Sequence, residues 1–460
     1  MSDWLQPALT YAKSWLEFQV RQGDLPGLQF AVATRDGLAT EAAFGKPAAS
    51  SREPLTTSHI FRVASHSKTF TAAAIMKLVD AGRLRLDDRA DLYVKGLHAD
   101  TATATIRQLL SHTAGIIRDG TDAGQWQLRR PFLDDSELRL ALADAPILPA
   151  NTRVKYSNHG FGLLGLIIES VTGERYADWI AREVVAAAGL KQTWPDVPTN
   201  STAKLVRGHG IRSLLGERFE VDIALGTGAL ASATGFSSTA SDLARFFQQL
   251  SPEASNSWLS VASRREMSRR HWRIPEMSIE RYYGLGTIQG GEGAWSWFGH
   301  SGAFPGCYSH TSVLPAHGLT VSIIVNALEV QPAMLVDGVI AILRGYSEGG
   351  APTAATAKWS GRWWTLFGAS DLVPMQDKVL VTMPSLLNPM MDATELGDVS
   401  ETRARIVKAG GFMSYGEPAS LKSGASGAVE ELWLGGTKLL PEAAVAAEVR
   451  GRFLKSESHA

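Results

Sequence analysis

The chain has 460 residues, 45% of them apolar and 20% charged, so it is long enough to bury more than one hydrophobic core. Its formal net charge of −1 at pH 7 argues against nucleic acid or an anionic membrane as a partner, because both need a clustered positive surface. Its one cysteine, Cys307, excludes an intrachain disulfide and suits a reducing compartment.

No targeting segment is recognisable. The first residues, Met1, Ser2 and Asp3, do not begin a basic and then apolar leader. No apolar run reaches the roughly 18 residues of a membrane-spanning helix. We therefore expect a soluble, cytoplasmic protein without membrane contact.

The chain opens with a helical pattern. Apolar residues recur at helical spacing over residues 3–21, and Gly23 ends the pattern. Two strand patterns follow, at residues 28–34 and 38–44. The Asp36-Gly37 pair between them predicts a tight hairpin turn.

Helical periodicity dominates the next section, and strand patterns return after about residue 280. The clearest helices are predicted over residues 68–81, 160–171 and 241–250. The later strands are predicted at 283–289, 308–314 and 319–326, before a helix over 332–344. We predict an α+β fold in which an antiparallel sheet is flanked by helices and carries an inserted helical subdomain, about residues 75–240.

The last part of the chain differs in composition. Residues 347–357 are rich in glycine, alanine and threonine and are predicted to be a linker. Over residues 358–460, short alternating runs between turn residues predict a small antiparallel barrel or sandwich. The first domain would then cover 1–346, with the N-terminal helix at 1–22. We expect the β domain to shape one side of the cleft or to mediate self-association.

The first of three polar motifs begins at Ser65, where a strand pattern runs into a helix. Residues i and i+3 share a helix face, so the Ser65 hydroxyl and the Lys68 amine can meet. A lysine whose pKa is lowered by burial can take the proton of a serine nucleophile. Alone, this spacing is a weak signal that often occurs by chance, and a capping serine with an exposed lysine would also explain it.

The second motif, Tyr156-Ser157-Asn158, precedes a glycine-rich helix. A tyrosine beside an ammonium group has its phenolate favoured and can act as a general base. An asparagine can orient a lysine and also donate to a substrate carbonyl.

The third motif lies within residues 298–306, where small residues would let a strand edge approach a substrate. The backbone N–H of Ala303 could form an oxyanion hole with that of Ser65. Ser301 also nearly fits the G-x-S-x-G pattern of a rival nucleophile. A strand pattern follows it instead of a helix, so we do not expect Ser301 to be the nucleophile. Cys307 is better explained as a buried apolar residue than as a thiol nucleophile.

In this order the three motifs resemble the serine β-lactamase-like superfamily, which includes class C β-lactamases, D-Ala-D-Ala carboxypeptidases and related esterases and D-aminopeptidases. Residues 109–115 and 235–239 are further short motifs typical of the superfamily, and the resemblance covers roughly residues 25–345. It implies that Ser65 is acylated and that Lys68 and Tyr156 handle its proton. The residues expected to bind the substrate are Asn158, His300, Ser301, Gly302 and Ala303.

His300 stands where the superfamily usually carries lysine. Histidine has a reference pKa near 6.5 and is largely neutral at pH 7, so it would attract a substrate carboxylate weakly. Members with histidine here resemble esterases and D-amino-acid peptidases more than β-lactamases. We therefore expect a serine hydrolase for a neutral ester or a small amide or peptide, with a D-residue as one option.

Two alternatives remain open: a β-lactamase or DD-carboxypeptidase, and a catalytically silent binding or regulatory protein on the same fold. No cofactor is expected. The eleven histidines lack paired ligand spacing, so no metal site is expected either. Self-association into a homo-oligomer is a further option.

Overall fold

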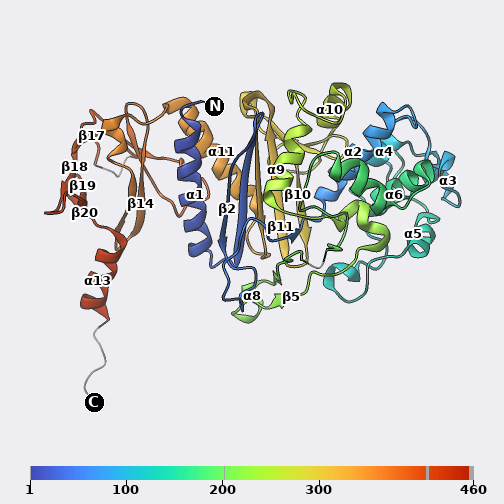
Figure 1. The fold of residues 1–460 in the computed structure, drawn as a ribbon, viewed down its shortest axis with the longest axis horizontal. Coiled ribbons are helices and arrows are strands. Elements are labelled where there is room, and N and C mark those ends of the chain that lie inside the picture. Colours follow the sequence, from blue (N-terminus) through green and yellow to red (C-terminus); the bar gives the residue numbers. More distant parts are fainter. Residues whose placement is uncertain (1, 201, 411–413, 455–460) are drawn as a thin grey trace, which may run out of the picture. The chain divides into compact units, whose positions relative to one another are not determined.

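The computed structural model describes residues 2–200, 202–410 and 414–454. The chain divides into two compact units, and Figure 1 labels their helices and strands. The larger unit is Asp24–Val336, and the smaller one joins Met1–Gly23 to Asp337–Ala460.

An eight-stranded antiparallel sheet is the framework of the larger unit. Its strands in spatial order are β2 (Gly37–Gly45), β1 (Gly27–Thr34), β12 (Leu319–Val325), β11 (Cys307–Leu314), β10 (Trp297–Phe304), β9 (Ile288–Gly290), β8 (Tyr282–Tyr283) and β7 (Trp272–Arg273). The two ends of the unit meet in this sheet, where Leu28 pairs with Val325. All of β1 is buried, as expected for an inner strand covered on both faces.

One predicted strand, over residues 283–289, is wrong. The chain turns there, and the Gly284 N–H donates to the Thr287 carbonyl at 2.8 Å. Gly286 adopts φ of +67°, and a Cβ built on it would lie 2.4 Å from the Cβ of Ala72. Close packing against the helix that contains Ala72 therefore breaks the run into β8 and β9.

Three helices confirm the predicted helical patterns. They are α2 (His66–Asp80), α6 (Asn158–Thr172) and α9 (Ala240–Gln249). Helix α9 packs on β1, β11 and β12, and α2 contacts both α6 and β10. The start of α2 therefore lies between a strand of the sheet and the helical region.

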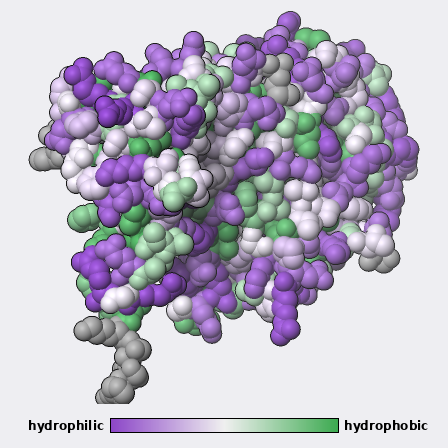
Figure 2. All heavy atoms as spheres, turned by 60° about the vertical axis from the view of Figure 1, so that its left-hand side comes forward, coloured by the Kyte–Doolittle hydropathy of each residue, from purple (hydrophilic) through white to green (hydrophobic). Residues whose placement is uncertain are grey.

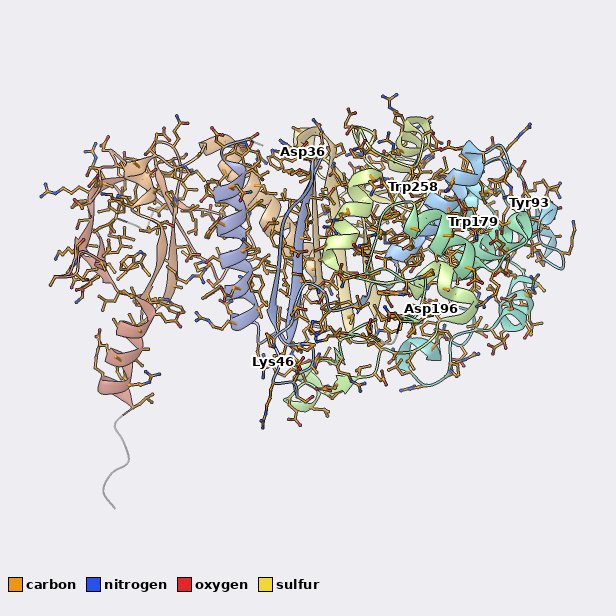
Figure 3. The ribbon with its side chains drawn as sticks, in the orientation of Figure 1. Asp36, Lys46, Tyr93, Trp179, Asp196 and Trp258 are labelled. Atoms are coloured by element: carbon orange, nitrogen blue, oxygen red, sulfur yellow. The ribbon has the colours of Figure 1, made fainter. Side chains whose placement is uncertain are left out.

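A buried ion pair fixes the approach to α2. The short strand β3 (Phe61–Arg62) pairs with β6 (Ser237–Ser238) just before the helix begins. The Arg62 side chain is fully buried and lies 3.0 Å from a carboxylate oxygen of Asp196, which is labelled in Figure 3. Its guanidinium carbon also lies 4.5 Å from the centre of the Phe304 ring at the end of β10. Arg62 thus ties the start of α2 to β10.

The smaller unit contains an eight-stranded antiparallel meander whose strands follow chain order. They are β13 (Gly361–Thr365), β14 (Gly368–Pro374), β15 (Val379–Thr382), β16 (Thr394–Gly397), β17 (Arg403–Lys408), β18 (Pro418–Ser423), β19 (Val429–Leu434) and β20 (Thr437–Leu439). Trp364 and Leu440 exchange backbone hydrogen bonds of 2.8 and 3.0 Å, which joins the first strand to the chain after the last. The predicted small β domain is confirmed, and it is barrel-like.

Helix α1 (Leu5–Gln22) belongs to this smaller unit, whereas the sequence placed residues 1–22 in the first domain. The Tyr11 hydroxyl lies 2.8 Å from the Thr382 hydroxyl, and the Gln19 amide donates to the Pro384 carbonyl at 2.6 Å. Trp15 is fully buried. The helix is therefore held by residues more than 350 positions away in the chain.

The segment predicted as a linker over 347–357 is partly helical. Helix α11 (Pro332–Gly349) runs past the predicted end at residue 344, and α12 (Ala354–Ala357) follows.

Polar and charged side chains cover most of the face shown in Figure 2. Within the described residues, no helix combines the length and the apolar character needed to span a bilayer.

Candidate active site

Ser65 lies directly before α2, and its hydroxyl does not cap that helix. The preceding Ala64 has φ of 45°, which is costly for a residue other than glycine. Strand β10 passes close to this turn, since a Cβ on Gly302 would lie 2.1 Å from the Val63 carbonyl oxygen. Only glycine at position 302 permits this approach of the strand to the serine.

Lys68, one helical turn after Ser65, is fully buried. Its Nζ lies 3.2 Å from Ser65 Oγ, 2.6 Å from Asn158 Oδ1 and 2.8 Å from the Ala233 carbonyl oxygen. Burial lowers the pKa of Lys68 well below its usual value. The last two partners accept only, so a neutral amine can donate to both and direct its lone pair at Ser65.

Asp119, which the sequence analysis missed, fixes the orientation of Asn158. The Asn158 Nδ2 donates to Asp119 Oδ1 at 2.6 Å, and this leaves Asn158 Oδ1 facing Lys68. The same carboxylate accepts from Trp126 Nε1 at 2.9 Å and lies 3.0 Å from Arg118 Nε. The amide that holds the lysine is therefore itself held by a buried carboxylate.

The Tyr156 hydroxyl is hydrogen-bonded to the Ser65 side chain. The Lys68 Nζ also lies 4.7 Å from the centre of the Tyr156 ring. Burial is the largest influence on Tyr156 and raises its pKa, although the bond to Ser65 opposes this. Burial thus opposes the phenolate that the sequence led us to expect and favours the protonated phenol.

His300 on β10 is neutral and fully engaged by its neighbours. Its Nδ1 lies 2.7 Å from the Ser301 carbonyl oxygen, so Nδ1 carries the proton and donates. Its Nε2 must then accept from the Tyr283 hydroxyl, which lies 3.0 Å away. Burial lowers the pKa of His300 to about 3. The ring lines the pocket, but neither nitrogen is left to bind a substrate carboxylate.

Ser301, the rival nucleophile, lies 2.7 Å from Nδ1 of His310. The other ring nitrogen of His310 contacts the Ser312 hydroxyl at 2.9 Å, so no carboxylate orients this histidine. Ser301 also lies within the continuous strand β10, whereas a nucleophile elbow needs a sharp turn into a helix. This arrangement is incomplete as a catalytic triad.

One pocket of about 510 Å³ brings most of the predicted site residues together. Ser65, Tyr156 and Asn158 line it opposite the β10 residues, and Lys68 contacts Ser65 and Asn158 from the buried side. The β10 residues in its lining are His300, Ser301, Gly302 and Ala303. The lining residues that the sequence analysis missed are Arg118, Trp126, Ile288, Tyr308, Ser309, Gln331, Pro332 and Ala333.

Other candidates lie outside this lining. Cys307 is fully buried, and burial raises the pKa of its thiol to about 12. His66, beside Ser65 in sequence, is buried under the strands, where its Nε2 lies 3.0 Å from the Thr311 hydroxyl. In the described part of the chain, no group of three or more acidic, histidine or cysteine side chains could hold a metal ion.

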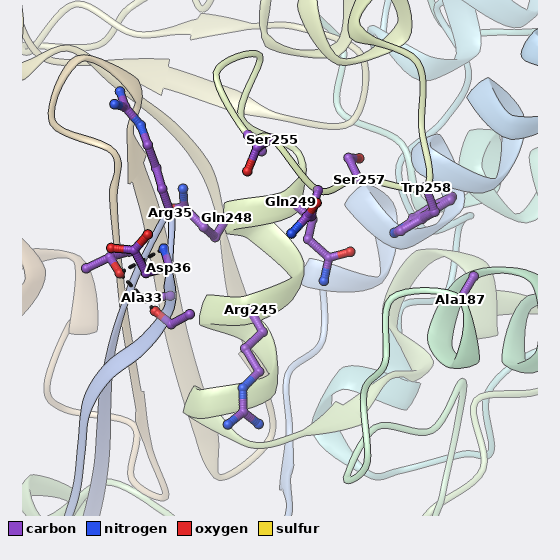
Figure 4. Close-up of a pocket in the computed structure, with 14 residues that line it drawn as sticks. Ala33, Arg35, Asp36, Ala187, Arg245, Gln248, Gln249, Ser255, Ser257 and Trp258 are labelled. Carbon is purple, nitrogen blue, oxygen red and sulfur yellow. Dashed lines mark hydrogen bonds between the residues drawn. The ribbon is translucent and has the colours of Figure 1, made fainter.

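A second pocket, shown in Figure 4, lies between the β1–β2 turn, α9 and residues 254–258. Arg35 and Asp36 lie on one side of it, and Trp258 lies on the other. Its two serines, Ser255 and Ser257, are not paired with a basic residue among those that the structure describes. The chemistry therefore points to the pocket at Ser65.

Comparison with known proteins agrees with this architecture. The sequence model of the family described as Beta-lactamase matches residues 12–343. The chain therefore belongs to the Beta-lactamase family, and the resemblance drawn from its three motifs is confirmed. Penicillin-binding protein 4 of Amycolatopsis lactamdurans is 35% identical over 177 residues, which are 37% of this chain and 44% of that protein. The chain thus matches less than half of this relative.

Solved structures share the fold. The octameric penicillin-binding protein homologue from Pyrococcus abyssi has a TM-score of 0.65 at 21% identity, over 94% of this chain and 100% of that one. SurE with D-Leu has a TM-score of 0.59 at 22% identity, over 94% and 99%. A D-stereospecific amidohydrolase from Streptomyces has a TM-score of 0.54 at 24% identity, over 66% and 90%.

Proposed function

We propose that this protein is a serine hydrolase that forms an acyl-enzyme on Ser65. The observation that carries the proposal is the contact of 3.2 Å between the Ser65 hydroxyl and the buried amine of Lys68. A lysine whose pKa is lowered can remove the proton of a serine as the serine attacks a carbonyl carbon. The other two serines of the pocket contact histidine rings: Ser301 lies 2.7 Å from His310 and Ser309 lies 3.1 Å from His66. The second nitrogen of each ring contacts a hydroxyl, so among the described residues neither histidine is oriented by a carboxylate as in a catalytic triad.

The proton then has a short route to the leaving group. Lys68 takes the Ser65 proton, and the protonated Tyr156, which is hydrogen-bonded to Ser65, donates to the leaving oxygen or nitrogen as its bond to the acyl carbon breaks. Lys68 then returns its proton to Tyr156. In the second half of the reaction Lys68 accepts a proton from the water that attacks the acyl carbon, and this proton passes to Ser65 Oγ as the bond between Ser65 and the acyl group breaks. The backbone N–H groups of Ser65 and Ala303, which line one pocket, would stabilise the oxyanion.

The substrate we propose is an ester or a small amide or peptide without a carboxylate at the His300 wall. His300 is neutral and both its ring nitrogens are hydrogen-bonded within the protein, which supports this choice over a substrate whose carboxylate would bind at position 300. The names of two structural neighbours refer to D-leucine and to D-stereospecific amide hydrolysis, and they favour a D-residue at the scissile bond. The cytoplasmic location expected from the sequence stays a prediction.

The alternative is a binding protein that uses the same pocket without turnover. A fluorophosphonate probe separates the two, with the labelled peptide identified by mass spectrometry. We expect labelling of the wild-type protein at Ser65, its loss in Ser65→Ala, and its retention in Ser301→Ala. Labelling that disappears only in Ser301→Ala would identify Ser301 as the nucleophile instead of Ser65. A folded wild-type protein that no probe labels would favour the binding protein.

The substrate class needs a separate screen. Matched p-nitrophenyl esters, D- and L-aminoacyl amides and a cephalosporin should be compared with the wild-type protein and with Ser65→Ala as the blank. We expect esters or D-aminoacyl amides to be turned over faster than the cephalosporin. Faster turnover of the cephalosporin would instead favour a β-lactamase.

A further inference from the structure

The lining of the active-site pocket, within the described residues, contains one formally charged side chain, that of Arg118. The remaining side chains are hydroxyls, two phenols, two amides, an imidazole and apolar groups. The Arg118 side chain is 64% exposed, so its guanidinium can be reached from solvent. An exposed cation in a cleft raises the local concentration of anions.

Arg118 is held at a defined place in the pocket. Its backbone carbonyl accepts the Asn158 N–H at 2.9 Å, which fixes the main chain beside the catalytic turn. Its Nε lies 3.0 Å from Asp119 Oδ2, and its guanidinium carbon lies 5.6 Å from the centre of the Tyr156 ring. A guanidinium held by its Nε edge retains two terminal nitrogens, which suit bidentate contact with a carboxylate.

Asp119 does not cancel this charge for a ligand. Its side chain is only 8% exposed, and Asn158 and Trp126 both donate to its Oδ1. The carboxylate is therefore occupied by protein donors and turned away from solvent, whereas the guanidinium is exposed. An incoming anion meets Arg118 first.

The pocket continues past Arg118. A second hollow of about 650 Å³ shares Arg118 and Trp126 with the active-site pocket. Its lining also includes Arg129 and Arg130 together with Asp119 and Asp122, and Arg130 lies 3.7 Å from Asp122. A substrate longer than one residue can therefore extend from Ser65 along Arg118 into a hollow of mixed charge.

We propose that Arg118 binds a carboxylate of the substrate and so determines specificity. The inference rests on the proposed hydrolase function and refines its substrate class. The preferred substrate is neutral where it faces His300 and acidic where it faces Arg118. The acidic group lies away from the scissile bond, on the side of the pocket formed by the Tyr156 turn.

The test compares two esters that differ only in one charge. One is the p-nitrophenyl half-ester of adipic acid, and the other is the same ester with its free acid methylated. A second pair made from suberic acid places the free carboxylate farther from the scissile bond. The measured quantity is the ratio of kcat/KM for the acidic ester to that for the neutral ester. Ser65→Ala gives the background rate. The full-length variants are Arg118→Gln, Arg118→Glu, Arg118→Lys and Arg175→Gln, the last being an exposed arginine outside the pocket.

We expect the wild-type protein to prefer the acidic ester, with the preference falling as salt is added. Arg118→Gln should lower the ratio by about 10- to 100-fold, as for loss of a hydrogen-bonded charge. Arg118→Glu should reverse the preference, Arg118→Lys should restore part of it, and Arg175→Gln should leave it unchanged. The neutral ester corrects for any general damage to the site.

The two proposals fail separately. If the wild-type protein hydrolyses both esters through Ser65 but the ratio is the same in Arg118→Gln, the carboxylate assignment is overturned while the hydrolase stands. An equal fall in the ratio for Arg175→Gln would also overturn it, because the effect would then be one of overall charge. If no ester acylates Ser65 in the wild-type protein, the proposed function itself fails.

Discussion

The Lys68 amine is the residue on which the proposed chemistry depends. It has no exposed surface, and two of its three polar contacts are to oxygens that can only accept. A protonated amine would direct its third proton at Ser65, whereas a neutral amine directs a lone pair there. The two states therefore differ in whether Ser65 can lose its proton.

Lys68→Arg tests this distinction, because arginine stays protonated at every accessible pH. We expect a loss of kcat/KM of about 10²- to 10⁴-fold for Lys68→Arg and also for Lys68→Ala. In the wild-type protein the base must be deprotonated, so kcat/KM should rise with pH, with a midpoint below 10.5 because burial lowers the pKa of Lys68. Activity of Lys68→Arg within tenfold of the wild-type value would contradict the assignment of the base.

Buried histidines add a second pH dependence, which acts on stability. Burial lowers the pKa of both His300 and His310 from 6.5 to about 3. Below pH 6.5 the unfolded chain binds protons that the folded protein does not, so stability falls as pH decreases from 6.5 towards 3. Each such histidine contributes at most about 1.4 kcal/mol per pH unit.

Urea unfolding at several pH values between 7 and 4 should show this loss. His310→Gln removes one of the two groups and should reduce the slope of the free energy of unfolding against pH. A slope that is the same in the wild-type protein and in His310→Gln would show that acid sensitivity has another origin.

At the scale of elements, the close approach of β10 to the turn before α2 aligns the two walls of the pocket. Gly302→Ala would place a Cβ 2.1 Å from the Val63 carbonyl oxygen, so the strand must move. We expect a stability loss of about 1–3 kcal/mol and at least about tenfold lower kcat/KM. Gly226→Ala is the matched control, since the nearest atom to its Cβ lies 3.9 Å away. Equal activity of the two variants would contradict this role for β10.

Local spacing explains why part of the site was predictable. Ser65 and Lys68 lie one helical turn apart, so their contact follows from sequence once the helix is assigned. Asp119 could not be found in this way, because it reaches Asn158 through tertiary folding of a loop 39 positions away. Tyr283 likewise reaches His300 only through the pairing of strands. No fixed spacing marks either contact.

The same limit applies to the elements. The strand patterns of β1, β11 and β12 were sufficient to predict these strands, because each strand is continuous. The apolar pattern of α1 predicted a helix but could not name its partner. That partner, the segment around residue 384, is known only from the folded chain. The protonation of Tyr156 also depended on burial that a motif does not reveal.

At the scale of the whole molecule, the pairing of α1 with the C-terminal strands predicts how truncations behave. Ending the chain after residue 346 removes the partners of Tyr11 and Gln19 and exposes Trp15, so soluble yield and melting temperature should both fall. Ending it after Pro441 removes α13 (Glu442–Phe453), which has no buried residue. This shorter deletion should leave the melting temperature nearly unchanged. Equal effects of the two deletions would contradict the assignment of α1 to the smaller unit.

The burial of Cys307 has a practical consequence for experiments on this protein. The native thiol is shielded by the sheet and resists ionisation, so maleimide dyes should leave it unmodified in the folded state. Any cysteine introduced at the surface would then be the single reactive position. Pairs of such positions could carry fluorophores that report the distance between the larger unit and the barrel-like unit when a ligand is added, without first removing a native cysteine.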